Sequence, residues 1–299
     1  MRRYFIVTGA ALAASIVMMP SAGASRGREW SEPANIGPTI NTPFEEAGPA
    51  ISEDGRVLYF QTDRPLRTNC DIWVAERESV HHEWNEPKPL AAINTDTCEN
   101  SVSLSRDEHH LFFTRPPGDI WVSYRRDVRD TFGWEPPVRL GPSINTDTAP
   151  ESTARHFASK RYGISELYLY RSRFVGPGLP LDPPDIYVAD MFGGPAEPVA
   201  ELNSPQTDAG AVLSRNGLEV FFHSTRTGIG GRDLWTATRR NLFEPWSTPT
   251  NVDSVNTTNE EWFPALSADD DTLFFASNRA GTFGGNDIYV TTRAPQRKH

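Results

Sequence analysis

Cysteine is scarce in this chain, which has only Cys70 and Cys98 among its 299 residues. Two thiols are too few for a structural zinc cluster, and no His-x-x-x-His spacing supplies the missing ligands. The sequence also lacks a Gly-x-Ser-x-Gly elbow and a glycine-rich phosphate loop. These absences exclude the common zinc, serine-hydrolase and nucleotide-binding constellations, so no catalytic residue and no cofactor are assigned.

Basic residues are outnumbered, since 29 Lys and Arg face 39 Asp and Glu, which gives a net charge of −10. An acidic surface argues against nucleic acid and anionic lipid as partners. The one long apolar run, Phe5 to Met19, follows two arginines and precedes Ala22-Gly23-Ala24. This pattern predicts a signal peptide over residues 1–24, hence a periplasmic or secreted protein with no membrane insertion after cleavage. An oxidising compartment permits a disulfide.

The rest of the chain repeats itself five times. Trp-x-x-Pro occurs at Trp30, Trp84, Trp134 and Trp246, with a degenerate copy at Pro195–Pro198. An aliphatic residue, Asn and Thr or Ser follow, at Asn41, Asn94, Asn145, Asn203 and Asn256. An acid comes next, then an Asp-aliphatic-aromatic run that begins at Asp71, Asp119, Asp185, Asp233 and Asp287. The four markers agree on five copies and leave no linker, so residues 25–299 are expected to form one domain.

Each copy contains short apolar runs separated by Asp, Gly and Asn clusters, as at 262–267, 272–277 and 287–292. These are strand and turn signals, and the Trp-x-x-Pro run is a fourth strand at an edge. Four-stranded sheets of this kind bury their faces when they are packed radially. The sequence therefore predicts an all-β fold, a five-bladed β-propeller of four-stranded antiparallel blades. Residues 30–36 are expected to pair with 287–292 and close the ring.

Four segments carry a resemblance to a known family. Two of them begin at a turn: Ala50-Ile51-Ser52-Glu53-Asp54-Gly55 with Val57-Leu58-Tyr59-Phe60, and Ala265-Leu266-Ser267-Ala268-Asp269 with Phe274-Phe275-Ala276-Ser277. The other two are Gly230-Gly231-Arg232-Asp233-Leu234-Trp235 and Gly284-Gly285-Asn286-Asp287-Ile288-Tyr289. These residues resemble the WD40-like, TolB-type propeller repeats of exported bacterial proteins, over roughly residues 30 to 293. The resemblance implies a propeller fold and export, and it implies no activity, because propellers host many functions.

The meander places one acid of each copy at the same rim of the central channel: Glu46, Glu99, Glu151, Asp208 and Glu261. Strand ends with the pattern Phe-x-Ser/Thr-x-Arg bring Arg64, Arg226 and Arg279 to that rim. Shorter variants of this pattern bring Arg115 and Arg173 there. Two interpretations remain open. The acids and arginines form cross-strand ion pairs, or the acids, where unpaired, bind a cation such as Ca²⁺ or a polar ligand. No metal site is assigned.

The other candidates break the repeat or lie beside it. Arg155 and His156, with Lys160 and Arg161, add positive charge in blade 3, whose long loop 174–184 is expected to overhang the rim. Cys70 precedes Asp71 and Cys98 precedes Glu99 in adjacent blades, so we expect them to form a disulfide. The repeated Asn and Trp residues are expected to serve turns and blade packing.

Three functions fit these features. The first is a non-catalytic, monomeric propeller of the cell envelope that binds a protein, peptide or glycan at the acidic rim. The second is a glycoside hydrolase that uses two rim carboxylates. The third is a scaffold stabilised by a cation. The regular blades and the missing catalytic constellation favour the first.

Overall fold

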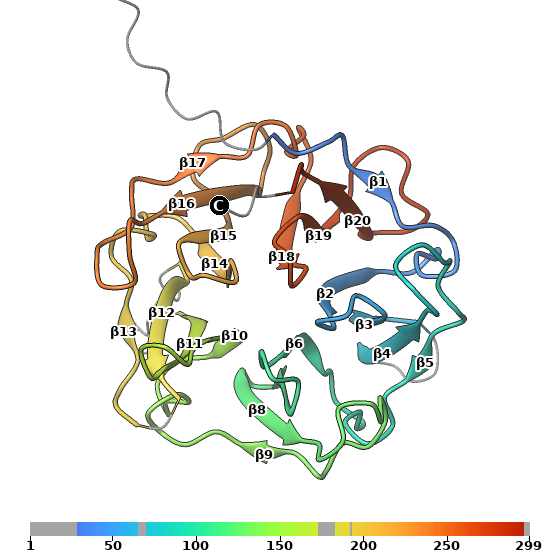
Figure 1. The fold of residues 1–299 in the computed structure, drawn as a ribbon, viewed down its shortest axis with the longest axis horizontal. Coiled ribbons are helices and arrows are strands. Elements are labelled where there is room, and N and C mark those ends of the chain that lie inside the picture. Colours follow the sequence, from blue (N-terminus) through green and yellow to red (C-terminus); the bar gives the residue numbers. More distant parts are fainter. Residues whose placement is uncertain (1–28, 65–69, 173–182, 192, 296–299) are drawn as a thin grey trace, which may run out of the picture.

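The computed structural model describes residues 29–64, 70–172, 183–191 and 193–295. Five four-stranded antiparallel sheets stand as blades around a central axis (Figure 1). In the described residues there is no helix with the length and hydrophobicity that a membrane crossing requires. The expected signal peptide, Arg173 and most of the loop 174–184 lie outside these residues.

Strands occupy the same radial position in every blade, and blades 1 to 5 follow the order of the chain. The innermost strands are β2 (Glu46–Ile51), β6 (Asn100–Leu104), β10 (Glu151–Ser159), β14 (Asp208–Leu213) and β18 (Glu261–Leu266). The second strands are β3 (Val57–Thr62), β7 (His110–Arg115), β11 (Ile164–Arg171), β15 (Glu219–Ser224) and β19 (Thr272–Ser277). The third strands are β4 (Asp71–Glu76), β8 (Asp119–Tyr124), β12 (Asp185–Asp190), β16 (Asp233–Thr238) and β20 (Asp287–Thr292). The outer strands are β5 (Lys88–Pro89), β9 (Val138–Arg139), β13 (Glu197–Pro198), β17 (Thr250–Asn251) and β1 (Ala34–Asn35).

The ring closes as the sequence predicts. Ala34 pairs with Val290 and Asn35 with Tyr289, so the first strand completes the last blade (Figure 1). A bridge between Trp30 and Arg293 extends this contact. Closure by pairing the two ends of the repeat leaves no blade incomplete, which confirms the five-bladed propeller.

The Trp-x-x-Pro motif needs one correction. Each outer strand has only two residues and follows the motif's proline, so the tryptophan itself lies before the strand. Blade 3 carries a shifted copy of the motif. Pro198 pairs with Tyr187 in the same way that Pro89 pairs with Trp73 in blade 1. By this register, Gly193 occupies the position that a tryptophan occupies in the other blades. The expected copy Pro195–Pro198 is therefore two residues out of register.

Apolar side chains pack between neighbouring blades. One cluster joins Tyr59 and Ile72 of blade 1 to Leu111, Phe113 and Trp134 of blade 2. The other motif tryptophans lie in equivalent clusters, which confirms their role in packing. Because each blade supplies half of two interfaces, the sheets form one continuous core.

A bulge bends every innermost strand two residues after the acid. The residues there have φ between +51° and +68°: Gly48, Ser101, Thr153, Gly210 and Phe263. At Gly48 a side chain would also meet Gln61, whose Oε1 accepts the Ser101 N–H at 2.8 Å. The bulge of one blade is thereby fixed to the next, around the axis.

We name the two sides of the ring by what they carry. The acid face has the loops into each innermost strand, including Glu46 and Glu99. The turn face has the turns from innermost to second strand, such as Ser52–Arg56. The two faces differ in what they offer a ligand.

Candidate functional site

The five acids of the acid face are fully buried, each with 0% of its surface exposed. Four form ion pairs at 2.8–3.1 Å: Glu46–Arg64, Glu99–Arg115, Glu151–Arg171 and Glu261–Arg279. The fifth ion pair is Asp208–Arg226. Arg115 and Arg171 lie directly opposite their acids, whereas the other three arginines come two residues after that position. Two sequence spacings thus deliver the same ion pair.

Hydrogen bonds complete this arrangement. Glu46 accepts from the N–H and hydroxyl of Thr42 at 2.8 and 2.6 Å. The preceding residue, Asn41, accepts the Ile288 N–H and donates to the Ile288 carbonyl, so it clamps the loop to the previous blade. The other four blades repeat the clamp through Asn94, Asn145, Asn203 and Asn256. The motif on the acid face therefore joins blade to blade.

Glu151 differs slightly from its four counterparts. Its Oε2 has no hydrogen-bond partner in the described residues, and burial raises its pKa. Even so, its Oε1 is held by Arg171 at 2.8 Å and by Thr146 at 2.7 Å. A ligand can reach these carboxylates only by displacing their arginines, so ligand contact by the acids and by Arg64, Arg226 and Arg279 stays a prediction.

Arg155 and His156 do not lie beside the acidic ring. β10 runs from Glu151 toward the turn face, and its register places Arg155 and His156 level with Ala50 and Ile51 of β2. Arg155 is 6% exposed, and its Nη1 donates to the Val102 carbonyl at 2.5 Å. His156 accepts the Arg106 N–H on Nδ1 at 3.3 Å and contacts Ser165 through Nε2 at 2.9 Å. Burial lowers its pKa to about 4, so His156 is neutral.

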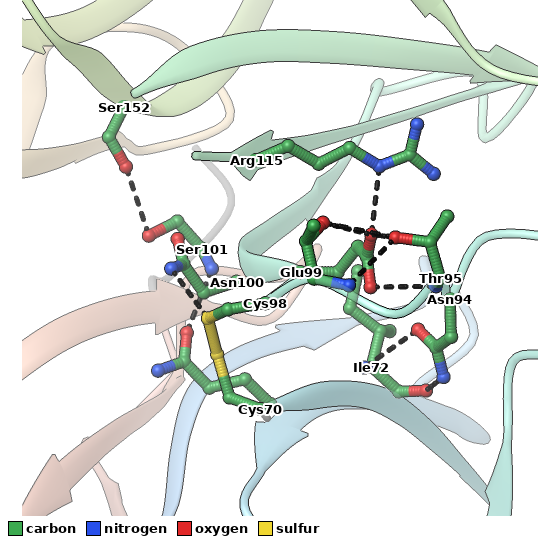
Figure 2. The surroundings of a disulfide bond; sticks show 12 residues. Cys70, Ile72, Asn94, Thr95, Cys98, Glu99, Asn100, Ser101, Arg115 and Ser152 are labelled. Atoms are coloured by element: carbon green, nitrogen blue, oxygen red, sulfur yellow. Dashed lines mark hydrogen bonds and ion pairs between the residues drawn. A yellow bond between two sulfur atoms is a disulfide. The ribbon is translucent and has the colours of Figure 1, made fainter. Parts of the chain in front are cut away.

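The disulfide between Cys70 and Cys98 is confirmed (Figure 2). It links the loop before β4 of blade 1 to the loop before β6 of blade 2. Beside it, the Glu99 N–H donates to the Cys70 carbonyl at 2.9 Å. The bond fastens two adjacent blades on the acid face, next to the buried Glu99–Arg115 pair (Figure 2).

A groove of about 1930 Å³ crosses the turn face. It starts at the mouth of the central channel and runs outward between blades 5 and 1. Its apolar floor contains Ile36, Ile51, Phe274 and Val290. Ile51 ends the innermost strand β2, Phe274 and Val290 lie on the second and third strands β19 and β20, and Ile36 follows the outer strand β1. The floor is therefore a radial stripe, which runs outward from the central axis.

The carboxylates in the groove are held by their own turns. Asp54 accepts from the Ser52 hydroxyl at 2.7 Å and the Arg56 N–H at 3.0 Å. Burial acts to raise its pKa, but these bonds and the Arg56 charge lower it overall. Asp107 is held likewise by the Ser105 hydroxyl, at 2.6 Å. Such side-chain bonds define turns and account for the repeated Ser-x-Asp sequence.

Asp270 has a different environment. It is 9% exposed and accepts the Arg215 N–H on both oxygens, at 2.7 and 3.0 Å. Burial raises its pKa, and the Arg215 N–H and the Arg293 charge oppose that shift. With φ of +62°, Asp270 occupies the turn position that is glycine in blades 1 and 4. It ties the turn of blade 5 to that of blade 4.

Sequence reasoning missed this groove. Its one available signal was the second turn position, which carries Glu53, Arg106, Lys160, Arg215 and Ala268 in blades 1 to 5. The charge of the residue at this position differs between blades, although every blade has a turn there. Among the described residues no group of three or more His, Cys, Asp or Glu could hold a metal ion, and stabilisation by a cation stays a prediction.

Comparisons with known proteins show the fold. No protein-family model matches the chain, and no curated protein matches its sequence. The structure is similar to the catalytic domain of a GH62 alpha-L-arabinofuranosidase from Coprinopsis cinerea, with 12% identity, 89% of this chain and 97% of that chain covered, and a TM-score of 0.57. It is similar to a thermostable family-43 glycoside hydrolase, with 11% identity, 87% and 98% covered, and a TM-score of 0.55. TolB from Acinetobacter baumannii is 14% identical, with 92% and 65% covered and a TM-score of 0.46.

Proposed function

We propose that this chain is an exported, non-catalytic propeller of the cell envelope that binds a protein segment in the groove of the turn face. The observation that carries the proposal is the radial apolar stripe of Ile36, Ile51, Phe274 and Val290 between charged turns. A long groove with an apolar floor and polar walls suits an extended peptide, whose alternate side chains can enter it.

A glycan is less well supported by the same groove. Sugar binding favours an exposed aromatic face, and the groove's Trp84 is 8% exposed with the Arg77 guanidinium 4.2 Å from its ring centroid. Phe274 is buried as well. Neither ring offers a free face, so the stripe serves aliphatic side chains better than sugar rings.

The test is retention of random-sequence dodecapeptides by the immobilised chain, read by mass spectrometry. Ile36→Glu places a charge on the groove floor, and Val138→Glu places one on the exposed outer strand of blade 2. The unmodified chain and Val138→Glu are expected to retain the same peptides, and Ile36→Glu to lose them. Equal retention by all three proteins would place binding elsewhere.

A glycoside hydrolase is the second candidate. Two groove carboxylates have pKa values shifted in opposite directions, raised at Asp270 and lowered at Asp54. Such divergence is what an acid and a base require. The likeness to two glycoside hydrolases supports the same idea at the level of fold. Hydrolysis of 4-nitrophenyl α-L-arabinofuranoside that is lost in Asp270→Asn would establish this activity in place of simple binding.

A further inference from the structure

Charge in the groove is divided between blades. At the second turn position, blades 2, 3 and 4 carry cations: Arg106, Lys160 and Arg215. The groove residues of blades 5 and 1 carry most of the carboxylates: Glu53, Asp54, Glu83, Asp269, Asp270 and Asp271. The groove thus gathers its cations at the channel mouth, where Glu53 is their counterpart in blade 1, and has an acidic wall along the apolar stripe.

The cations at the mouth are only partly compensated. Arg106 donates through Nη1 to the carbonyls of Ala158 and Arg215, at 3.1 and 2.7 Å. Of the three, only Arg215 forms an ion pair within the described part of the chain, with Glu53 at 3.0 Å. Burial, and then the nearby Arg215 charge, lower the pKa of Arg106, while the charges of Glu53 and Asp270 oppose that shift. Repulsion between neighbouring like charges favours an anion beside them, and Glu53 already supplies part of that negative charge to Arg215.

We propose that the groove binds the carboxyl terminus of a peptide, with the terminal carboxylate on Arg106, Lys160 and Arg215. This inference rests on the proposed function and gives the bound segment a direction. Guanidinium groups bind carboxylates through paired, charge-assisted hydrogen bonds. The residues before the terminus run outward along Ile51, Phe274, Val290 and Ile36, and a basic side chain among them faces the wall that contains Asp269 and Asp271.

The geometry favours a chain end over an internal acidic side chain. The cations stand at the inner end of the stripe, where the groove meets the mouth of the channel. Arg106 reaches from blade 2 to the Arg215 carbonyl of blade 4, and Arg215 reaches Glu53 of blade 1. These contacts cross the mouth, so a chain that enters along the stripe ends there.

The probes are two pools of random octapeptides with acetylated N-termini, one ending in a free carboxylate and one in a carboxamide. The purified chain is expected to retain the acid pool about tenfold better, because hydrogen bonds to a charged group are worth that factor or more. Lys160→Gln is the first variant, since Lys160 is exposed and its loss leaves the turn intact. Arg106→Gln is the second, with thermal melting as a check of folding.

Lys88→Gln is the matched control, because Lys88 is an exposed lysine on the outer strand of blade 1 and outside the groove. It is expected to keep the preference, while Lys160→Gln and Arg106→Gln bring the two pools toward equal retention. Equal retention by the unmodified chain would overturn the carboxylate inference and leave peptide binding standing. Retention of neither pool would overturn both, and a preference unaffected by either groove variant would also overturn the inference.

Discussion

The guanidinium carbon of Arg77 lies 4.2 Å from the centroid of the Trp84 ring, and its Nε donates to the Gly55 carbonyl at 2.8 Å. One arginine thereby joins the outer-strand motif to the turn of the same blade. The same contacts recur for Arg125 with Trp134 and Glu108, Arg239 with Trp246 and Gly217, and Arg293 with Trp30 and Asp270. Blade 3 has Met191 and Gly193 instead, so both partners are missing together.

This pairing predicts coupled losses of stability. Trp246→Ala should cost about 3–5 kcal/mol, because it empties a buried site between blades 3 and 4. In a double-mutant cycle with Arg239→Ala, urea denaturation should give a coupling of about 1–2 kcal/mol. Phe243→Ala, a largely exposed ring in the same loop, is the control and should change stability by less than about 0.5 kcal/mol. A coupling near zero would mean that the stacking adds nothing to packing.

The buried acids should matter for stability and leave the groove unaffected. Glu261→Gln removes the charge that faces Arg279 at 3.1 Å and should cost about 3–5 kcal/mol, since one partner of a buried pair stays charged. Peptide retention by the turn face should not change. Glu86→Gln, on the surface, is the control. Loss of ligand binding in a still-folded Glu261→Gln protein would restore the acid face as a binding site.

The disulfide should contribute through the unfolded chain. Its cysteines are separated by 28 residues, and a loop of that size predicts about 3–4 kcal/mol of stabilisation from lost chain entropy. Cys70→Ser with Cys98→Ser should therefore lower the melting temperature, and reduction should add nothing further in that variant. If the double variant and the unmodified chain melted together, the bond would be dispensable for blades 1 and 2.

The repeat explains how much of this structure the sequence could predict. Blade number, strand positions and ring closure follow from markers that every blade must carry, because each packs against two equivalent neighbours. The ion pairs followed only in part, because acid and arginine are 16 residues apart in blade 2 and 20 in blade 3, and Glu151 pairs with Arg171, whereas the sequence predicts Arg173 at the rim. Cys70 and Cys98 could be paired because the repeat places both on one face of adjacent blades.

The turn face could not be predicted in the same way. The pattern Ser-x-Asp predicts a turn. The sequence of one turn does not indicate which charged residues the turns of the other four blades place beside it. Arg155 and His156 were expected near Glu151 because they follow it closely. The innermost strand itself carries them toward the other end of the channel, since they stand level with Ala50 and Ile51 of β2.

Arg155 itself yields a prediction about a buried charge. Its Nε and Nη2 have no hydrogen-bond partner in the described residues, and burial lowers its pKa to about 10. Replacing a buried ion pair with apolar side chains of similar volume is often neutral or stabilises by about 1–4 kcal/mol, and the buried Arg155 guanidinium forms no ion pair among the residues that the structure describes that would offset its burial. Arg155→Met should therefore match or exceed the unmodified chain in urea denaturation at pH 7. Arg64→Met, which strands the buried Glu46, should be less stable. A destabilised Arg155→Met would indicate that the guanidinium has a partner in solution.

His223 should make the propeller sensitive to acid. It is 4% exposed, packs edge-on against Trp262 and Phe263, and accepts the Phe263 N–H on Nδ1. Burial, with the charges of Arg232 and Arg155, lowers its pKa from 6.5 to about 3. The unfolded chain then takes up a proton near pH 6.5 that the folded chain refuses until about pH 3.

Stability is consequently present above pH 6.5 and lost as the pH falls toward 3, by up to about 1.4 kcal/mol per pH unit for this one proton. His223→Gln keeps an acceptor for Phe263 and cannot be protonated, so its stability should fall less steeply between pH 6 and pH 4. His82→Gln, an exposed histidine, should follow the unmodified chain. Because carboxylates titrate equally in all three proteins, the difference in slope isolates His223, and parallel curves would show that this histidine is already protonated in the folded ring.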